Sequence, residues 1–501
     1  MRTIYYVFTS CLLLLIGCNT EASKSTHNQM ASRVLTDAQW TEDLDSLYFL
    51  LKENHQNLYK RTNVAAFEEL FAEIKEEIPT LEDHEITARF AQFVALANDG
   101  HTRLTLPLQE GIGLSQAHSR TELPTDTTLV FRHLPVEFYW FDDGLFITRA
   151  TKDYAHLLGR EVIKINNVLT TDALENARSL SHFDNEYGHM LIAPSRLAIL
   201  EILKSLDIVE NDAEQVVLTT VFDGKTEDVS LSALSRLPKV KFMDSGYDMA
   251  PTDVILSRQN TDQYYWHSYL EEEKTLFLQI NQMNNAPEGT RLIKFLGMVD
   301  DEIKRISPER IVLDLRNNFG GDNTYSISVV NLLLKNPHLN EPGRFYTLIG
   351  RKTFSAAQHL VNDLRRWTDV IFVGEPTGSS PSSFGDAVRQ QLPNSGLTVR
   401  IATIYWTDTS GRDQDVKWVA PDLPAPNLAS DYFKNEDAAF RMCLDYPIDI
   451  SLPHMYKNLY DSGGMATATR LYIRLVCDWE TPEDDLAAVE DHLVQWLEEN
   501  Q

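Results

Sequence analysis

The chain has 501 residues, of which 43% are hydrophobic and 24% are charged, and a chain of this kind can bury a large core without a disulfide scaffold. The formal net charge of −28 at pH 7 argues against a nucleic-acid-binding protein and against a polybasic membrane-surface protein, because both need a basic face. The motifs CxxC, HExxH and GxxxxGKS/T do not occur, so the sequence gives no support to a zinc protease or a P-loop enzyme.

The N-terminus reads as a targeting segment. Arg2 is followed by an apolar run over residues 5–16, which is too short to span a bilayer as a helix of about 20 residues. The run ends in Leu15-Ile16-Gly17-Cys18, which resembles a bacterial lipoprotein signal. This resemblance implies lipidation of Cys18 and a location in the cell envelope, and Asn19 favours the outer membrane.

Two cysteines remain outside the signal, Cys443 and Cys477. They could form a disulfide in an oxidising envelope, or each could be an isolated buried thiol. The sequence leaves both alternatives open.

Residues 36–98 predict three helices, because apolar residues recur there at spacings of three and four. Gly100 is expected to stop the third helix. The apolar positions are Trp40, Leu44, Leu47, Leu50 and Leu51 in the first helix, Phe67, Leu70, Phe71 and Ile74 in the second, and Ile86, Phe90, Phe93, Val94 and Ala97 in the third.

Residues 126–240 predict a small mixed module. Strands at 136–140 and 145–147 flank Asp142-Asp143-Gly144, which is typical of a hairpin turn. A strand, a polar turn and a short helix follow from Gly159, an order that resembles the second half of a PDZ module. A helical stretch from Ser195 to Leu206 interrupts that pattern.

Residues 255–430 alternate strands and helices, which predicts a layered α/β core with a sheet covered on both faces. Helices are then expected from residue 431 to the end, including amphipathic ones at 467–477 and 486–497 that could dock a partner. The strands expected in the core are 274–280, 310–315, 345–349 and 370–373, and the helices are 290–306, 326–334 and 355–367.

One serine is placed as a nucleophile would be. Ser355 lies between an expected strand and an expected helix, so the positive end of the helix dipole would favour negative charge beside it. The Ala356 N–H could donate to an oxyanion formed there. The alternative is an ordinary N-cap serine.

Three other segments could complete the site. The strand that ends in Asn317-Asn318-Phe319-Gly320-Gly321 could supply N–H groups to an oxyanion, or could form an ordinary turn. His101 is a possible general base, although it lies 254 residues before Ser355, and the alternative is a surface or capping histidine. Asp413, Asp415 or Asp422 could orient that histidine, or could belong to a solvated acidic loop.

Taken in order, these segments resemble the serine peptidase family of the C-terminal processing (tail-specific) proteases and the tricorn core protease. The resemblance covers residues 90–425 and implies a crotonase-like catalytic core, often with a PDZ module. The matching motifs are Asp99-Gly100-His101-Thr102, Leu313 to Gly321, Lys352-Thr353-Phe354-Ser355-Ala356-Ala357, Val373-Gly374-Glu375-Pro376-Thr377-Gly378, Leu392-Pro393-Asn394-Ser395 and Pro421-Asp422.

The resemblance also bears on the catalytic base. Tail-specific members pair the serine with a downstream lysine, but no lysine lies between Ser355 and Lys417. Tricorn-type members use a histidine, which His101 matches, and a later glutamate. Asp415, which lies 60 residues after Ser355, stands near that glutamate's place, with Asp413 as its substitute. A serine precedes the tricorn-type histidine, whereas Gly100 stands there in this chain.

These observations predict a lipid-anchored serine peptidase of the cell envelope that needs no metal or organic cofactor. Ser355 would be the nucleophile, His101 the base and Asp415 its orienting partner, with Gly320, Gly321 and Ala356 forming the oxyanion hole. A catalytically inactive protein that binds peptides or hydrophobic ligands, and an esterase, are the alternatives. The expected parts are a signal peptide (1–17), a flexible tether (18–35), a helical region with the histidine motif (36–125), a PDZ-like module (126–240), the catalytic core (241–430) and a C-terminal helical extension (431–501).

Overall fold

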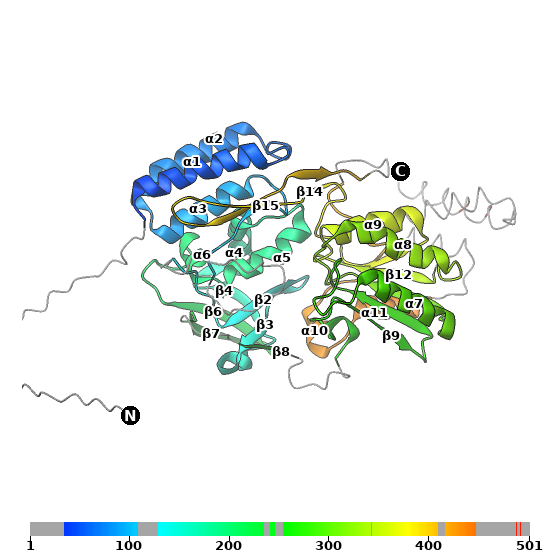
Figure 1. Cartoon of the computed structure of the whole chain (residues 1–501). Helices are drawn as coiled ribbons and strands as arrows, with labels where there is room; N and C mark the ends of the chain where they lie inside the picture. The colour runs from blue at the N-terminus through cyan, green and yellow to red at the C-terminus, as the bar shows by residue number, and fades with distance from the viewer. Residues whose placement is uncertain are drawn as a thin grey trace, which may run out of the picture. The chain divides into compact units, whose positions relative to one another are not determined.

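The computed structural model describes residues 35–108, 129–234, 241–245, 254–341, 343–408 and 416–446, together with the single residues 487 and 491 (Figure 1). The predicted signal peptide with Cys18, the helices predicted at 467–477 and 486–497, and Cys477 all lie outside these ranges. Among the residues that are described, no helix combines the length and the apolar character needed to cross a membrane.

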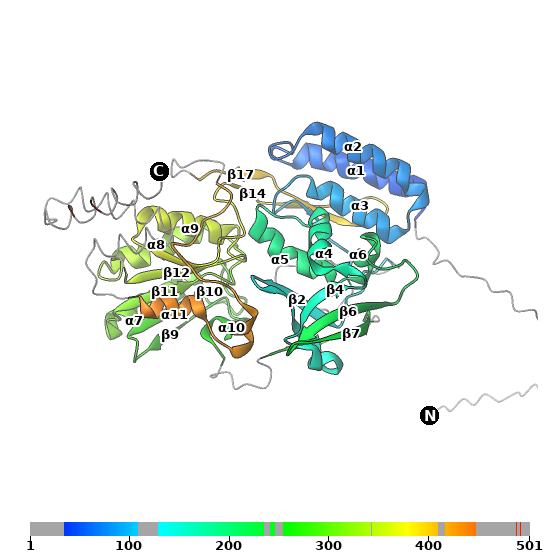
Figure 2. The ribbon, with the colours of Figure 1, turned by 180° about the vertical axis from the view of Figure 1, so that it is seen from behind.

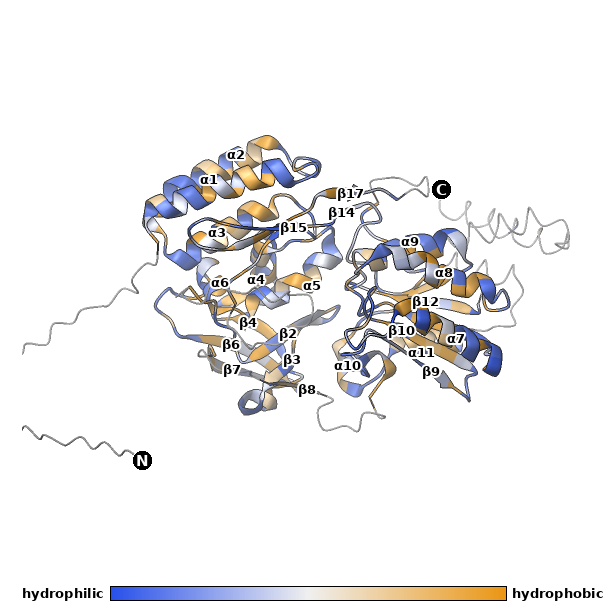
Figure 3. Cartoon of the chain, in the orientation of Figure 1, coloured by the Kyte–Doolittle hydropathy of each residue, from blue (hydrophilic) through white to orange (hydrophobic). Residues whose placement is uncertain are grey.

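The three predicted N-terminal helices are confirmed as α1 (Asp37–Asn54), α2 (Val64–Glu77) and α3 (Asp83–Ala95), with the short 3-10 helix η1 (Ile78–Thr80) after α2. Thr36 caps α1 through a capping box, and the side chain of Asn63 accepts a hydrogen bond from Ala66 N at the start of α2. The apolar faces of the helices pack together, whereas polar residues face outward, so α1 and α2 carry both colours in Figure 3.

The end of α3 differs from the prediction. The helix ends at Ala95, and the chain turns at Asn98, which has the left-handed φ of 54°. Gly100 is therefore not the helix stop. A Cβ on Gly100 would lie 2.5 Å from the Phe354 ring, so a larger residue there would force that ring to shift.

An antiparallel sheet follows in the order β2-β3-β4-β6-β7, with β5 paired to β4 and β8 paired to β3. The predicted hairpin around Asp142-Asp143-Gly144 is confirmed by β2 and β3. The bounds are β2 (Val136–Phe141), β3 (Gly144–Thr151), η2 (Lys152–Leu157), β4 (Glu161–Ile165), β5 (Val168–Leu169), β6 (Gln215–Phe222), β7 (Lys225–Ser232) and β8 (Phe242–Asp244).

The helices of this module are α4 (Thr170–Asn176), η3 (Ala177–Leu180), α5 (Glu186–Leu197) and α6 (Leu200–Ser205). The continuous helix predicted for 195–206 is wrong, because Ile199 is extended and forms a β-bridge with His133. That bridge joins the break between α5 and α6 to the segment just before β2. The resemblance of the module to a PDZ domain stays a prediction.

The layered α/β core is confirmed as a sheet of order β18-β13-β12-β11-β10-β9, in which only β9 runs antiparallel to its neighbour (Figures 1 and 2). In register, Phe277 lies opposite Val312, which lies opposite Tyr346. The strands are β9 (Tyr265–Leu270), preceded by η5 (Leu256–Arg258), β10 (Thr275–Ile280), β11 (Arg310–Asp314), β12 (Phe345–Ile349), β13 (Ile371–Gly374) and β18 (Leu423–Pro424).

Both faces of this sheet are covered, as predicted. Leu276, Leu278 and Leu313 belong to the hydrophobic cluster formed with α7, α8 and α9, whereas Phe277 and Val312 belong to the cluster formed with α11. Because successive side chains of a strand point to opposite faces of the sheet, adjacent residues such as Leu276 and Phe277 belong to different clusters. The helices are α7 (Leu292–Ile306), η6 (Asn323–Tyr325), α8 (Ser326–Lys335), α9 (Ala356–Trp367), α10 (Ala429–Lys434) and α11 (Ala438–Asp445).

Cys443 is completely buried on α11, where its thiol donates to the Ala439 carbonyl oxygen at 3.3 Å. Because Cys477 lies outside the described residues, the pairing of these two cysteines stays a prediction.

A hairpin that lies between β13 and β18 in sequence returns to the N-terminal helices. β15 (Val388–Gln391) and β16 (Thr398–Ile401) form a three-stranded sheet with β1 (Arg103–Leu104), and nearby β14 (Ser383–Gly385) pairs with β17 (Ile404–Trp406). Asp43 of α1 accepts hydrogen bonds from the Asn394 and Ser395 amides, both at 2.8 Å. This return connects the segment carrying His101 to the chain that follows β13 of the parallel sheet.

Candidate active site

Ser355 lies at the N-terminus of α9, directly after a tight loop that leaves β12. Its φ of 57° and ψ of −123° form a strained conformation for a serine, of the kind found where a side chain must be presented at a turn. Hydrogen bonds fix the loop: Thr353 Oγ1 donates to the Leu315 carbonyl at 3.0 Å, and Phe354 N donates to the Asn318 carbonyl at 3.1 Å. The loop before the serine is thus held against the backbone of the loop that follows β11, by one side-chain and one backbone hydrogen bond.

His101 and Ser355 lie together despite their separation in sequence. His101 Nε2 is 3.0 Å from Ser355 Oγ, and the imidazole stacks on the Phe354 ring with centroids 4.6 Å apart. This is the distance at which a general base removes a hydroxyl proton.

The electrostatic environment keeps His101 in its basic form. Burial, which disfavours the imidazolium ion, lowers the pKa of His101 below its usual value, although the charges of Asp184 and Asp99 act in the opposite direction. The neutral imidazole can therefore accept a proton at neutral pH.

A buried carboxylate fixes the backbone of the histidine motif. Asp99 Oδ1 accepts hydrogen bonds from the amides of His101 at 2.7 Å and Thr102 at 2.6 Å, and Asp99 Oδ2 lies 2.9 Å from His55 Nε2. Burial opposes ionisation of Asp99, but the hydrogen bond and charge of His55 outweigh it, so the pKa of Asp99 is lowered.

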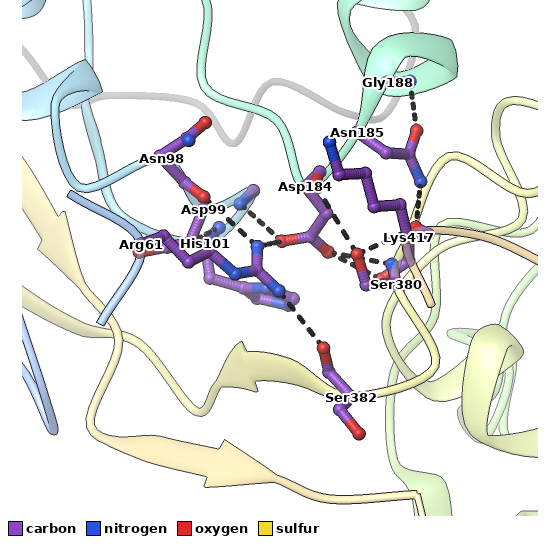
Figure 4. A network of polar contacts seen from close by, with 12 residues as sticks. Arg61, Asn98, Asp99, His101, Asp184, Asn185, Gly188, Ser380, Ser382 and Lys417 are labelled. Carbon is purple, nitrogen blue, oxygen red and sulfur yellow. Dashed lines mark hydrogen bonds and ion pairs between the residues drawn. The ribbon is translucent and has the colours of Figure 1, made fainter. Parts of the chain in front are cut away.

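A second buried carboxylate, Asp184, lies two residues before α5 and joins three parts of the chain (Figure 4). Its Oδ1 accepts from Arg61 Nη1 at 2.9 Å and from Gly100 N at 3.1 Å, and its Oδ2 accepts from Ser379 Oγ at 2.8 Å. The Asp184 side chain has no exposed surface. It therefore links the histidine motif to the loop that follows β13.

The third member of the expected triad is not seen. Asp415 and its substitute Asp413 lie outside the described residues. The buried His101 Nδ1 has no hydrogen-bond partner among the residues that are described. The role of either aspartate therefore stays a prediction.

The residues expected to form the oxyanion hole lie beside the serine. A Cβ on Gly320, which has a φ of 103°, would be 2.7 Å from Ser355 Cβ and 2.8 Å from Ala356 N. The Gly320 amide donates to Asn318 Oδ1 at 2.8 Å, so it is engaged within its own turn. The amides of Gly321 and Ala356 make no hydrogen bond to any described residue.

His101 and Ser355 line a cavity of about 960 Å³, which is large enough for a ligand of several residues. Besides His101 and Ser355, its lining includes Arg103, Arg389, Arg400, His359 and Trp406. Within the described ranges, no three His, Cys, Asp or Glu side chains gather as a metal site requires. The absence of a cofactor stays a prediction.

Several of these residues were not singled out from the sequence. Arg61, His55 and Asp184 contact the histidine motif from distant positions and belong to no local pattern. His359 lies one helical turn after Ser355, where the spacing alone could have indicated it. Its Nδ1 is 2.9 Å from Asn323 Nδ2, and burial lowers the pKa of His359 to about 4.

Comparison with solved structures shows what the fold resembles. Mature CPAF complexed with lactacystin matches with a TM-score of 0.55 and 14% sequence identity, over 82% of this chain and 97% of that chain. The photosystem II D1 C-terminal processing protease matches at 12% identity over 81% and 99% of the two chains, with a TM-score of 0.35. Tricorn protease matches at 11% identity over 82% and 36%, also with a TM-score of 0.35.

The chain therefore has a fold that resembles that of mature CPAF, and two of the matched structures are proteases of the kinds that the sequence motifs resemble. No protein-family model and no curated protein sequence matches the chain.

Proposed function

We propose that this protein is a serine peptidase that uses Ser355 as its nucleophile and His101 as its general base. The observation that carries the proposal is the 3.0 Å contact between His101 Nε2 and Ser355 Oγ at a helix N-terminus. The fold, which resembles that of mature CPAF, supports it.

In the proposed reaction, Ser355 Oγ attacks the carbonyl carbon of the scissile bond while His101 Nε2 takes the hydroxyl proton. The carbonyl π electrons move to oxygen, and the oxyanion accepts hydrogen bonds from the Ala356 and Gly321 amides, which no described residue occupies. The C–N bond then breaks as His101 gives its proton to the leaving amine. Water hydrolyses the remaining ester by the same steps, and the serine is restored.

The choice of base rests on the positions of the charged groups. Lys352 precedes Ser355 by three residues, but it is half-buried and the charges that act on it are those of Glu137 and Arg149. Among the described residues near Ser355, His101 is the group that forms a hydrogen bond with its hydroxyl. A Ser–His mechanism is therefore favoured over a Ser–Lys dyad.

The experiment is digestion of a defined peptide library by the full chain, with cleaved bonds identified by mass spectrometry. Ser355→Ala should abolish all cleavage, whereas Ser430→Ala, which alters an exposed serine on α10, should leave it unchanged. Cleavage of esters without cleavage of any peptide would replace the proposal with an esterase. Binding of peptides without hydrolysis would identify an inactive binding protein.

Anchoring to the cell envelope through Cys18 is a separate proposal that rests on the signal-like sequence alone. Incorporation of a labelled fatty acid by the full chain, lost in Cys18→Ala, would support it. Incorporation that is equal in both proteins would contradict it.

A further inference from the structure

Three arginines form a row across the small sheet β1-β16-β15. Arg103 lies directly opposite Arg400, and Arg400 lies directly opposite Arg389. Because directly paired residues of an antiparallel ladder project to the same face, the three side chains share one face of the sheet. All three line the cavity that contains His101 and Ser355.

This row carries positive charge that no carboxylate of the described residues neutralises by an ion pair. None of the three arginines forms an ion pair with a described residue, and Arg400 Nε is buried without a hydrogen-bond partner there. By contrast, Arg61, Arg132, Arg316 and Arg351 each contact a carboxylate. Like charges placed directly opposite one another destabilise a sheet, so the row is costly to the fold by itself.

The electrostatic environment agrees with this geometry. Burial lowers the pKa of Arg103 to about 9, and the neighbouring charges of Arg400, Arg196 and Arg389 add to the effect. The charges of Arg103 and Arg400 also act on His101, so the row lies close to the reacting atoms. Such an arrangement in an acidic chain is typical of a site completed by an anionic ligand.

We propose that the row Arg103–Arg400–Arg389 is a subsite that binds a carboxylate of the peptide substrate. The proposal rests on the peptidase function proposed above. A guanidinium group matches a carboxylate with two parallel N–H donors, and Arg400 Nε is a donor that such a ligand could satisfy.

The dimensions limit where the carboxylate lies along the substrate. Neighbouring strands are about 4.8 Å apart, so the row spans roughly 10 Å, the length of about three extended peptide residues. The carboxylate is therefore expected within a few residues of the scissile bond. It is either a Glu or Asp side chain or the free C-terminus of the peptide.

The test uses four versions of one cleaved peptide: Glu or Gln at the position facing the row, each with a free or an amidated C-terminus. Removing the recognised carboxylate should lower kcat/KM by roughly tenfold or more, the effect of one lost hydrogen bond to a charged group. A loss with Gln identifies a side-chain carboxylate, and a loss with the amide identifies the C-terminus. Equal values for all four peptides would overturn the proposal.

Arg400→Gln and Arg389→Gln should each reduce the preference for the carboxylate peptide. If the Arg400 variant does not fold, the Arg389 variant still provides the test. Arg305→Gln, which changes an exposed arginine on α7, should retain the preference. A preference that is unchanged in both row variants would contradict the proposal.

Failure of catalysis is separable from failure of the subsite. Binding of the same four peptides to the full-length Ser355→Ala protein, followed by fluorescence anisotropy, measures recognition without hydrolysis. Tighter binding of the carboxylate peptide that is lost in Ser355→Ala/Arg389→Gln supports the subsite even where the wild type cleaves nothing. Equal affinities overturn it.

Discussion

The two halves of the proposed active site are held in different ways. Ser355 is fixed mainly by backbone, through its positive φ, its place at the start of α9 and the bond from Phe354 N to the Asn318 carbonyl, with one side-chain bond from Thr353 to Leu315. The segment around His101 is instead fixed by side chains, because the buried carboxylates of Asp99 and Asp184 accept hydrogen bonds from its backbone amides.

This difference has consequences for stability and for pH. Backbone hydrogen bonds such as that of Phe354 N do not depend on which side chain the residue carries, so the segment around Ser355 should tolerate most substitutions that spare Thr353 and its glycines. A buried carboxylate is more demanding, since loss of its partner or its charge leaves polar groups unsatisfied. The segment around His101 should therefore lose its structure more readily than the segment around Ser355, both on mutation and at acidic pH.

The largest expected effect comes from removing the base itself. His101→Gln retains a side chain of similar size but cannot accept the serine proton, so kcat should fall roughly 10⁴-fold or more. The melting temperature should change little. Steady-state kinetics with a cleaved peptide would measure this, and a fall of less than tenfold would mean that another group serves as the base.

The next effect concerns the orienting carboxylate of the histidine half. Asp415→Asn should lower kcat roughly 10³–10⁴-fold if Asp415 holds the histidine tautomer, whereas Asp413→Asn should have little effect. The two variants are a matched pair because the residues lie two positions apart in the sequence. The reverse result would assign the role to Asp413, and two active variants would remove both from the mechanism.

Gly320→Ala tests the serine half, where backbone geometry is expected to decide. The new Cβ would lie 2.7 Å from Ser355 Cβ, so the loop must shift, and misplacement by about 1 Å can cost roughly 100-fold in rate. The control is Gly297→Ala on α7, where a Cβ meets no atom within 4 Å. Peptide kinetics should separate the two, and equal activity would show that the Gly320 turn is not fitted to the serine.

Asp184→Asn probes the carboxylate that joins the histidine motif to the loop after β13. Loss of the buried charge opposite Arg61 should lower the free energy of unfolding by about 3 kcal/mol, with roughly tenfold lower kcat. Asp45→Asn is the matched control, because its ion pair with Lys75 is exposed and is worth about 1 kcal/mol or less. Urea unfolding would measure both, and equal losses would contradict a structural role for the buried pair.

The smallest effects concern pH. Burial lowers the pKa values of His133 and His359 to about 4, so below pH 6.5 the unfolded chain binds more protons than the folded one. Stability should be full above pH 6.5 and should fall progressively toward pH 4. Because burial also lowers the pKa of His101, the acidic limb of kcat/KM should lie below pH 6.5.

Urea midpoints and peptide kinetics between pH 4 and 8 would check these two expectations. A stability that is constant over this range would mean that the histidines are not buried in neutral form. An acidic limb above pH 6.5 would contradict the environment described for His101.

The sequence predicted those elements whose contacts are local. The apolar runs at 275–280, 310–314 and 345–349 became fully buried strands, and the amphipathic spacing of 292–306 became α7. The motifs around His101 and Ser355 could be found because each consists of consecutive residues.

What the sequence did not predict depends on distant contacts. The return of β15 and β16 to the N-terminal helices, and the bonds of Asp184 to Arg61 and Ser379, join segments more than 100 residues apart. No local period or turn signal records such contacts. Gly100 shows the same limit, since the space at this position is restricted by the Phe354 ring and not by the helix before it.

The central claim is an activated Ser355–His101 pair, and the most direct measurement is labelling of the full chain with a fluorescent fluorophosphonate. Wild type should be labelled, Ser355→Ala and His101→Ala should not, and all three should melt at similar temperatures. Labelling that persists in Ser355→Ala, or folded wild type that is not labelled at all, would contradict the account.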